Sequence, residues 1–175
     1  MKETRRNGRR IATAIHARLI LNQRLTFSLK TATIMINESL FSSQSDEWST
    51  PQEFFYRYDS IYHFTLDAAS TDANAKCDNH FTIAEDGLKQ NWGGQTVWLN
   101  PPYGRQIGKW VEKAYQESRQ PNTTVVCLLP ARTDTKWFHD FCKRGTISFI
   151  RGRLKFGGSR NSAPFPSMVV VFRSD

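Results

Sequence analysis

The chain has 175 residues, of which 39% are hydrophobic and 23% charged, a balance typical of one globular domain with a sizeable core. No run of about 18 apolar residues occurs, so we expect no membrane-spanning helix. Three cysteines (Cys77, Cys127 and Cys142) are too few and odd in number for a secreted disulfide framework, and they favour a reducing cytoplasm.

The net charge of +8 is concentrated at the start of the chain. Residues 1–34 contain eight Lys or Arg and one Glu, a net charge of +7, which leaves +1 for residues 35–175. Such a segment is typical of a dispensable extension upstream of a second start at Met35, of an arm attracted to DNA phosphates, or of a targeting peptide. We expect residues 1–34 to be a disordered or dispensable basic extension, and residues 35–175 to form a single domain.

The first regular element is predicted after a polar, Ser-rich loop over residues 35–49. In STPQEFFYRYDSIY, Thr50 can cap a helix, Pro51 suits its first position and Glu53 completes a capping box. The face expected to be buried contains Phe54, Phe55, Tyr58 and Ile61.

The middle of the chain contains a short strand, an irregular segment and then the clearest unit of the sequence. A short strand over residues 63–70 ends near Asp67, and residues 71–95 show little regular pattern apart from a possible short strand near Phe81. The apolar strand TVWL, the amphipathic helix IGKWVEKAYQES and the apolar strand TTVVCLLP then follow within about 35 residues. This order is typical of a βαβ crossover between parallel strands.

Three elements are predicted at the end of the chain. DTKWFHDFCKRG indicates a helix capped by Asp134 and ending near Gly145, and TISFIRGRLKF and SMVVVFR indicate two closing strands joined by a loop over residues 157–167.

The expected fold class is α/β, with a mainly parallel, doubly wound sheet covered by helices on both faces. In such sheets ligands bind beyond the carboxyl ends of the strands, where Asp67, Asn100 and Pro130 lie.

The segment Asn100-Pro101-Pro102-Tyr103 breaks the strand TVWL with two prolines. A residue before proline is restricted to extended backbone, and proline has no N–H to donate. The corner therefore offers the Asn100 amide oxygen, a backbone carbonyl near Pro101 and the ring face of Tyr103. Two acceptors can hold both N–H bonds of an amino group while the ring stacks on its planar system, which favours nucleophilic attack by the nitrogen. The alternative is a structural proline corner with Tyr103 as packing.

NPPY at the end of a strand resembles catalytic motif IV of S-adenosylmethionine-dependent amino methyltransferases that act on adenine. Over about residues 45–173 the chain resembles the phage-type DNA N(6)-adenine methyltransferase (Dam-like) family. The motifs that carry this resemblance, in order, are DEWSTPQEFF, FTLDAAST, NAKCDNHFTIAEDGL, VWLNPPYG, LLPARTDTKWFHD and IRGRLKFGG…APFPSMVVVF.

The resemblance implies a function and a fold. The fold would be a Rossmann-like methyltransferase fold of reduced size, and residues 35–175 would be the catalytic domain. It would transfer the methyl group of S-adenosylmethionine to the exocyclic amino group of adenine in double-stranded DNA, with the target base flipped out of the duplex. The enzyme would act in the cytoplasm of a bacterial or phage-infected cell, for example in protection against restriction.

The resemblance also implies site residues. The corner that holds the target amine would consist of Asn100, Pro101, Pro102 and Tyr103. The cofactor would contact Asp67, Ala68, Ala69, Trp48, Thr50 and Pro51. The familiar Gly-rich cofactor loop is absent from DAAST, so we expect Asp86 to bind the adenosine, the alternative being a solvated turn acid.

Basic and metal-ligating side chains form two further groups. Phosphate or base contacts are expected from Arg132, Arg151, Arg153 and Lys155, the alternative being an ordinary solvated charge pattern. Cys77-x-x-His80 and His139-x-x-Cys142 could form a zinc site. Because Cys142 falls on the apolar face of its predicted helix, core packing is favoured and no metal is expected.

Three other functions are compatible with the same sequence motifs. An RNA-adenine or protein-glutamine methyltransferase would need the same corner, although the latter enzymes show a Gly-rich cofactor loop. A catalytically silent DNA-binding module on the same fold is a further alternative. The intact NPPY sequence favours an enzyme over that module.

Overall fold

The structure is a computed structural model that describes residues 48–174. The basic segment 1–34 and the predicted domain start at residue 35 lie outside the described residues. The helices are α2 (Gln52–Tyr62), α3 (Ile107–Glu117) and α4 (Lys136–Asp140), with two 3-10 turns, η1 (Cys142–Arg144) and η2 (Phe156–Gly158). The strands are β1 (Leu66–Asp67), β2 (Thr96–Leu99), β3 (Thr124–Pro130), β4 (Thr146–Phe149) and β5 (Ser167–Arg173). None of the helices within 48–174 has the length and apolar character needed to cross a bilayer.

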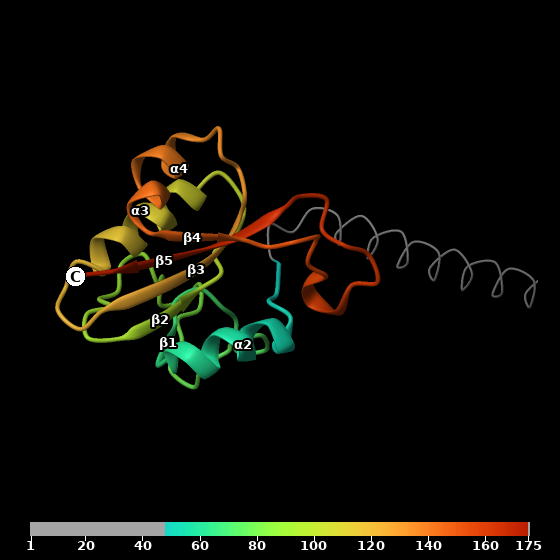
Figure 1. Cartoon of the computed structure of the whole chain (residues 1–175). Helices are drawn as coiled ribbons and strands as arrows, with labels where there is room; N and C mark the ends of the chain where they lie inside the picture. Colours follow the sequence, from blue (N-terminus) through green and yellow to red (C-terminus); the bar gives the residue numbers. More distant parts are fainter. Residues whose placement is uncertain (1–47, 175) are drawn as a thin grey trace, which may run out of the picture. The chain divides into compact units, whose positions relative to one another are not determined.

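The described strands form one sheet in the order β1-β2-β3-β5-β4 (Figure 1). β1, β2 and β3 pair in parallel, whereas β5 is antiparallel to both of its neighbours, β3 and β4. The α/β class is confirmed, and the sheet is mixed, with β5 alone running against the other strands. The chain passes from β4 to β5 through a loop over residues 150–166 without a crossover helix, and such a connection returns the strand in the opposite direction.

Helices cover both faces of the sheet. Val97, Val125 and Phe172 are in register on adjacent strands, so their side chains share one face. Phe172 contacts Tyr115 of α3 with a ring-centroid distance of 5.9 Å, which places α3 on that face. The next residue of β2, Trp98, points to the opposite face, where its ring packs against α2. The unit β2-α3-β3 therefore forms as the sequence predicts.

The start of α2 differs from the prediction. The N-cap residue is Pro51, with extended backbone, and no side chain caps the helix. Thr50 Oγ1 instead lies 3.0 Å from Asn100 Nδ2 and accepts its hydrogen bond. The predicted capping box of Thr50 and Glu53 is therefore wrong, because the hydroxyl makes a long-range contact instead.

The buried face of α2 is narrower than predicted. Phe54 and Phe55 are buried, and the Phe55 ring lies 5.4 Å from Trp98 in an edge-on arrangement. Tyr58 is half-buried and lies 6.3 Å from the same indole. Ile61 is 68% exposed, so its predicted place on the buried face is wrong.

The end of the chain also differs in its boundaries. α4 has five residues, its N-cap residue is Thr135, and no side chain caps it, so the cap predicted for Asp134 is wrong. The helix breaks at Phe141, whose backbone leaves the helical region, and η1 follows. Cys142 is fully buried, as the apolar face predicts. β4 ends at Phe149, earlier than predicted, which leaves residues 150–166 as a long loop.

Candidate functional site

A cavity of about 450 Å³ lies beyond the carboxyl ends of β1 and β2. Its walls come from residues 48–50, parts of the segment 67–88, the end of β2 with the following prolines, and the start of α3. The predicted site residues that line it are Trp48, Thr50, Asp67, Ala69, Asp86, Asn100, Pro101 and Pro102. Of the residues predicted to hold the amine or the cofactor, Ala68, Pro51 and Tyr103 do not line it. The rim of the sheet thus brings together most of the predicted site.

Asn100 is held in one orientation by the segment that precedes α2. Its Nδ2 donates to the Trp48 carbonyl at 2.5 Å and to Thr50 Oγ1 at 3.0 Å. Because a carbonyl oxygen can only accept, the amide nitrogen must face Trp48. Asn100 Oδ1 then points elsewhere, and it is buried without a hydrogen-bond partner among the described residues. The corner therefore holds an oriented acceptor with unused hydrogen-bonding capacity.

Asp67 ends β1 and organises the loop after it. Its Oδ2 accepts a hydrogen bond from the Lys76 backbone N–H at 2.9 Å, and its Oδ1 accepts one from the Ala69 N–H at 3.4 Å. Burial raises the pKa of Asp67, and these two backbone donors partly oppose the rise. The carboxylate has further lone pairs for a ligand, so it can shape the loop and also face the cavity.

Tyr103 is packed inside the protein. Its hydroxyl donates to the Leu128 carbonyl at 3.1 Å, and its ring makes edge-on contacts with Phe165 at 5.5 Å and Phe156 at 6.2 Å. Both phenylalanines belong to loop 150–166. The Tyr103 ring, which the sequence predicts to stack on the base, is therefore buried and in contact with this loop.

Buried polar atoms without partners are concentrated at the cavity. Among the described residues, these atoms are Ser70 Oγ, Trp98 Nε1, Asn100 Oδ1 and Ser167 Oγ. Ser70, Trp98 and Asn100 all line the cavity. Buried polar groups in folded proteins are nearly always paired, so these three residues have hydrogen-bonding capacity for the water or ligand that fills the cavity.

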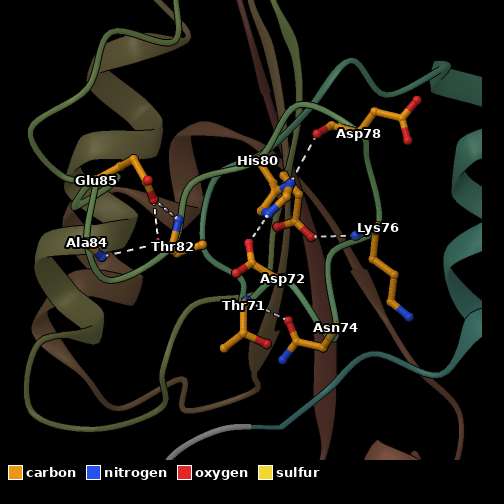
Figure 2. A network of polar contacts seen from close by, with 10 residues as sticks. Thr71, Asp72, Asn74, Lys76, Asp78, His80, Thr82, Ala84 and Glu85 are labelled. Atoms are coloured by element: carbon orange, nitrogen blue, oxygen red, sulfur yellow. Dashed lines mark hydrogen bonds and ion pairs between the residues drawn. The ribbon is translucent and has the colours of Figure 1, made fainter.

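The loop after β1 has little regular secondary structure but is held by a polar network (Figure 2). The Thr71 N–H donates to Asn74 Oδ1 at 2.8 Å, and His80 Nε2 lies 3.1 Å from Asp72 Oδ1. Hydrogen bonding to Asp72 raises the pKa of His80. The network gives this wall of the cavity a defined shape without a helix or strand.

Asp86 lies further along the same wall. Its backbone has a φ of 55°, in the left-handed region, and its Oδ2 lies 3.0 Å from Lys89 Nζ. Its carboxylate is therefore already paired at the surface, although the residue lines the cavity.

The predicted DNA-contacting residues lie away from carboxylates. Arg132, Arg151, Arg153 and Lys155 are exposed, and none forms an ion pair with a carboxylate of residues 48–174. Residues 141–174 contain no Asp or Glu at all. Ile150 and Leu154 of the same loop are half-buried against the core. The segment thus presents a strongly positive surface that can meet phosphates.

Several cavity residues escape prediction from the sequence. Ser70, Lys76 and Ile83 lie in the irregular segment 67–88, where no periodicity indicates which side chains face inward. Trp110 also borders the cavity, and its place in the first turn of α3 after the NPPY corner was the available signal. Among residues 48–174, no group of three or more His, Cys, Asp or Glu could hold a metal ion.

The sequence is similar to those of known proteins. The model of the DNA N-6-adenine-methyltransferase (Dam) family matches residues 37–174. The chain is 30% identical over 149 residues to the DNA N-6-adenine-methyltransferase of Haemophilus phage HP1, an alignment that covers 79% of this chain and 85% of the relative. It is 39% identical over 95 residues to the DNA N-6-adenine-methyltransferase of Escherichia phage T1, covering 53% of this chain and 39% of that relative.

Proposed function

The chain belongs to the DNA N-6-adenine-methyltransferase (Dam) family, and from this premise we propose how its residues methylate adenine. S-adenosylmethionine occupies the cavity beyond β1 and β2. The target adenine of double-stranded DNA is flipped out of the duplex and its amino group meets the Asn100 corner. The observation that carries the proposal is the oriented, unpartnered Oδ1 of Asn100.

The cavity suits such a cofactor. Its volume of about 450 Å³ lies in the range of small-molecule sites, and three of its residues carry buried polar atoms without partners. When bound, S-adenosylmethionine supplies the methyl group for transfer. The Asp67 carboxylate suits the ammonium of the amino-acid end, and Trp48, Thr50, Ala69 and Asp86 form walls around the remainder. Ala68 donates its backbone N–H to the Trp98 carbonyl at 3.0 Å, and Pro51 is the N-cap of α2, so both lie beside residues of the cavity wall.

The amino group of the target adenine is held by two acceptors. Asn100 Oδ1 accepts one of its N–H bonds and the backbone carbonyl near Pro101 accepts the other. Both prolines lack an N–H, so the corner presents acceptors without competing donors. Acceptors fixed before the reaction stabilise the developing positive charge on the nitrogen without reorganisation.

Stacking of Tyr103 on the flipped base requires a change in loop 150–166. Phe156 and Phe165 of this loop contact the Tyr103 ring in the structure. The same loop carries Arg151, Arg153 and Lys155, which we expect to contact DNA phosphates together with Arg132. We therefore expect DNA that binds these cations to displace the loop from Tyr103.

Residues 35–175 and the basic segment 1–34 have different proposed roles. We propose that residues 35–175 form the methyltransferase catalytic domain, and the family match from residue 37 supports this. The basic segment 1–34 then adds affinity for DNA phosphates without being needed for methyl transfer.

Incubation of the protein with methyl-labelled S-adenosylmethionine and DNA, RNA or protein tests the function. We expect label in DNA only, recovered after digestion as N6-methyladenine, and a loss of that label in the Asn100→Ala variant. Label in RNA or on glutamine would support the other methyltransferases. DNA binding without cofactor binding or methylation would support a silent DNA-binding module.

A further inference from the structure

Lys76 is the single Lys or Arg among the described residues that line the cavity. We propose that its ammonium group binds the carboxylate at the amino-acid end of the cofactor, beside Asp67, which meets the ammonium of the same end. This inference rests on the proposed function, because it takes S-adenosylmethionine as the occupant of the cavity.

The position of Lys76 is set by Asp67 and by α2. Its backbone N–H donates to Asp67 Oδ2 at 2.9 Å, which places the residue beside the end of β1. Its side chain extends away from the network of His80 and Asp72 (Figure 2). Nζ then donates to Gln52 Oε1 in the first turn of α2 at 2.8 Å. The backbone of Lys76 thus lies next to the acid that ends β1, and its ammonium group is held against the first turn of α2.

The ammonium group keeps hydrogen-bonding capacity for a ligand. An ammonium has three N–H donors, and the described residues provide Nζ with one acceptor, Gln52. Within residues 48–174, no carboxylate lies within ion-pair distance of Lys76. The side chain is half-buried, and burial lowers its pKa while Asp67 opposes the shift. This cation has lost part of its hydration and has no ion-pair partner among the described residues. A bound anion would therefore stabilise it through a charge-assisted hydrogen bond.

The charges of the cavity match those of the ligand. Its lining contains two carboxylates, Asp67 and Asp86, and one ammonium, Lys76. Asp86 is paired with Lys89, so Asp67 and Lys76 are the opposite charges left to face a ligand. The amino-acid end of S-adenosylmethionine also carries one ammonium and one carboxylate. Asp67 and Lys76 therefore form a receptor for a zwitterion, whereas a nucleoside without an amino-acid end would leave Lys76 unpaired.

Calorimetric titration with two ligands tests the inference independently of catalysis. The ligands are S-adenosylhomocysteine and its decarboxylated analogue, which differ in the carboxylate that Lys76 would bind. We expect Lys76→Met to weaken S-adenosylhomocysteine binding by about 10-fold or more, because a charge-assisted hydrogen bond is lost. The affinity for the decarboxylated analogue should be unchanged, and Lys76→Arg should restore most of the lost affinity for S-adenosylhomocysteine.

A matched control separates this effect from a general loss of positive charge. Lys109 is exposed on α3, does not line the cavity and forms no ion pair with the described residues, so Lys109→Met should bind both ligands as the parent does. Equal affinities of Lys76→Met and the parent for S-adenosylhomocysteine would overturn the role of Lys76. So would an equal loss for both ligands. A parent protein that binds neither ligand would instead overturn the proposed cofactor.

Discussion

The Trp48 carbonyl accepts a hydrogen bond from Asn100 Nδ2 at 2.5 Å, across 52 positions of the chain. The Trp48 ring packs edge-on against Phe165 at 5.0 Å and Phe156 at 5.5 Å, both in loop 150–166. The adjacent Ser49 carbonyl accepts a hydrogen bond from Gly157 of that loop at 2.8 Å. One short segment therefore joins the proposed acceptor for the target amine, the wall of the cavity and loop 150–166.

Substitution of Asn100 tests the acceptor. In Asn100→Ala the target amine loses Oδ1, and loss of one such hydrogen bond in the transition state costs about 3 kcal/mol, or about 100-fold in the rate of methylation. In Asn100→Asp an oxygen remains, but the carboxylate cannot donate to the Trp48 carbonyl. We expect rates in single-turnover assays in the order Asn, Asp, Ala.

The aspartate variant also reports on the segment before α2. Repulsion between its carboxylate and the Trp48 carbonyl should loosen that wall and weaken cofactor binding, whereas alanine should alter affinity less. Calorimetry with S-adenosylhomocysteine measures both effects. Parental methylation rates in both variants would show that the double proline is only a structural corner.

Replacement of Asp67 should affect the cofactor more than the fold. Asp67→Ala removes the acceptor for the backbone N–H groups of Lys76 and Ala69, and leaving a buried donor unpaired costs about 1–3 kcal/mol of stability. It also removes the charge that faces the ligand's ammonium. We expect a folded variant by circular dichroism, with a lower melting temperature and at least about 10-fold weaker cofactor binding. Unchanged affinity would show that Asp67 serves the loop alone.

Two substitutions of Tyr103 distinguish stacking from packing. Tyr103→Phe loses the hydrogen bond to the Leu128 carbonyl, worth about 1 kcal/mol of stability, and keeps the ring. Its methylation rate should remain close to that of the parent. Tyr103→Leu keeps apolar volume but has no ring, and a stacking role predicts a large fall in the rate at unchanged cofactor affinity. A leucine variant that methylates DNA like the phenylalanine variant would assign Tyr103 to the core.

The basic residues of loop 150–166 should control the salt dependence of DNA binding. Replacing Arg151, Arg153 and Lys155 by Gln should lower DNA affinity and reduce the slope of log K against log salt by about 0.9 for each phosphate that the variant no longer neutralises. Fluorescence anisotropy with duplex DNA at several salt concentrations measures the slope. The matched control replaces three exposed cations outside the loop, Lys109, Arg119 and Arg173. Equal slopes in the two triple variants would contradict the assignment to this loop.

The His80–Asp72 contact should make stability depend on pH. Hydrogen bonds to Asp72 and to the Asp78 carbonyl raise the pKa of His80 above its ordinary value of 6.5. The stabilisation is therefore fully present below pH 6.5 and is lost as the pH rises through the raised pKa. Since the pair is at the surface, we expect less than about 1 kcal/mol. His80→Gln should lower the melting temperature at pH 5.5 and change it little at pH 9, and an equal change at both values would contradict this role.

The sequence by itself determined the local units of this protein. Apolar runs and helical spacing are properties of neighbouring residues, so β2, α3 and β3 form where the pattern predicts them. The extended corner at Asn100 likewise follows from two consecutive prolines. The rule that ligands bind beyond the carboxyl ends of strands then placed Asp67 and Asn100 at one rim, and both line the cavity.

The tertiary structure alone decided which competing contacts form. Thr50 could cap α2 locally, but its hydroxyl accepts from Asn100, 50 positions away, because that contact pairs a half-buried amide. β5 lies between β3 and β4, since a strand's partners depend on the whole sheet rather than on its own pattern. The packing of Tyr103 under loop 150–166 and the approach of Lys76 to Asp67 arise in the same way. Both contacts involve distant or irregular segments. In such segments no local periodicity predicts the direction in which a side chain points.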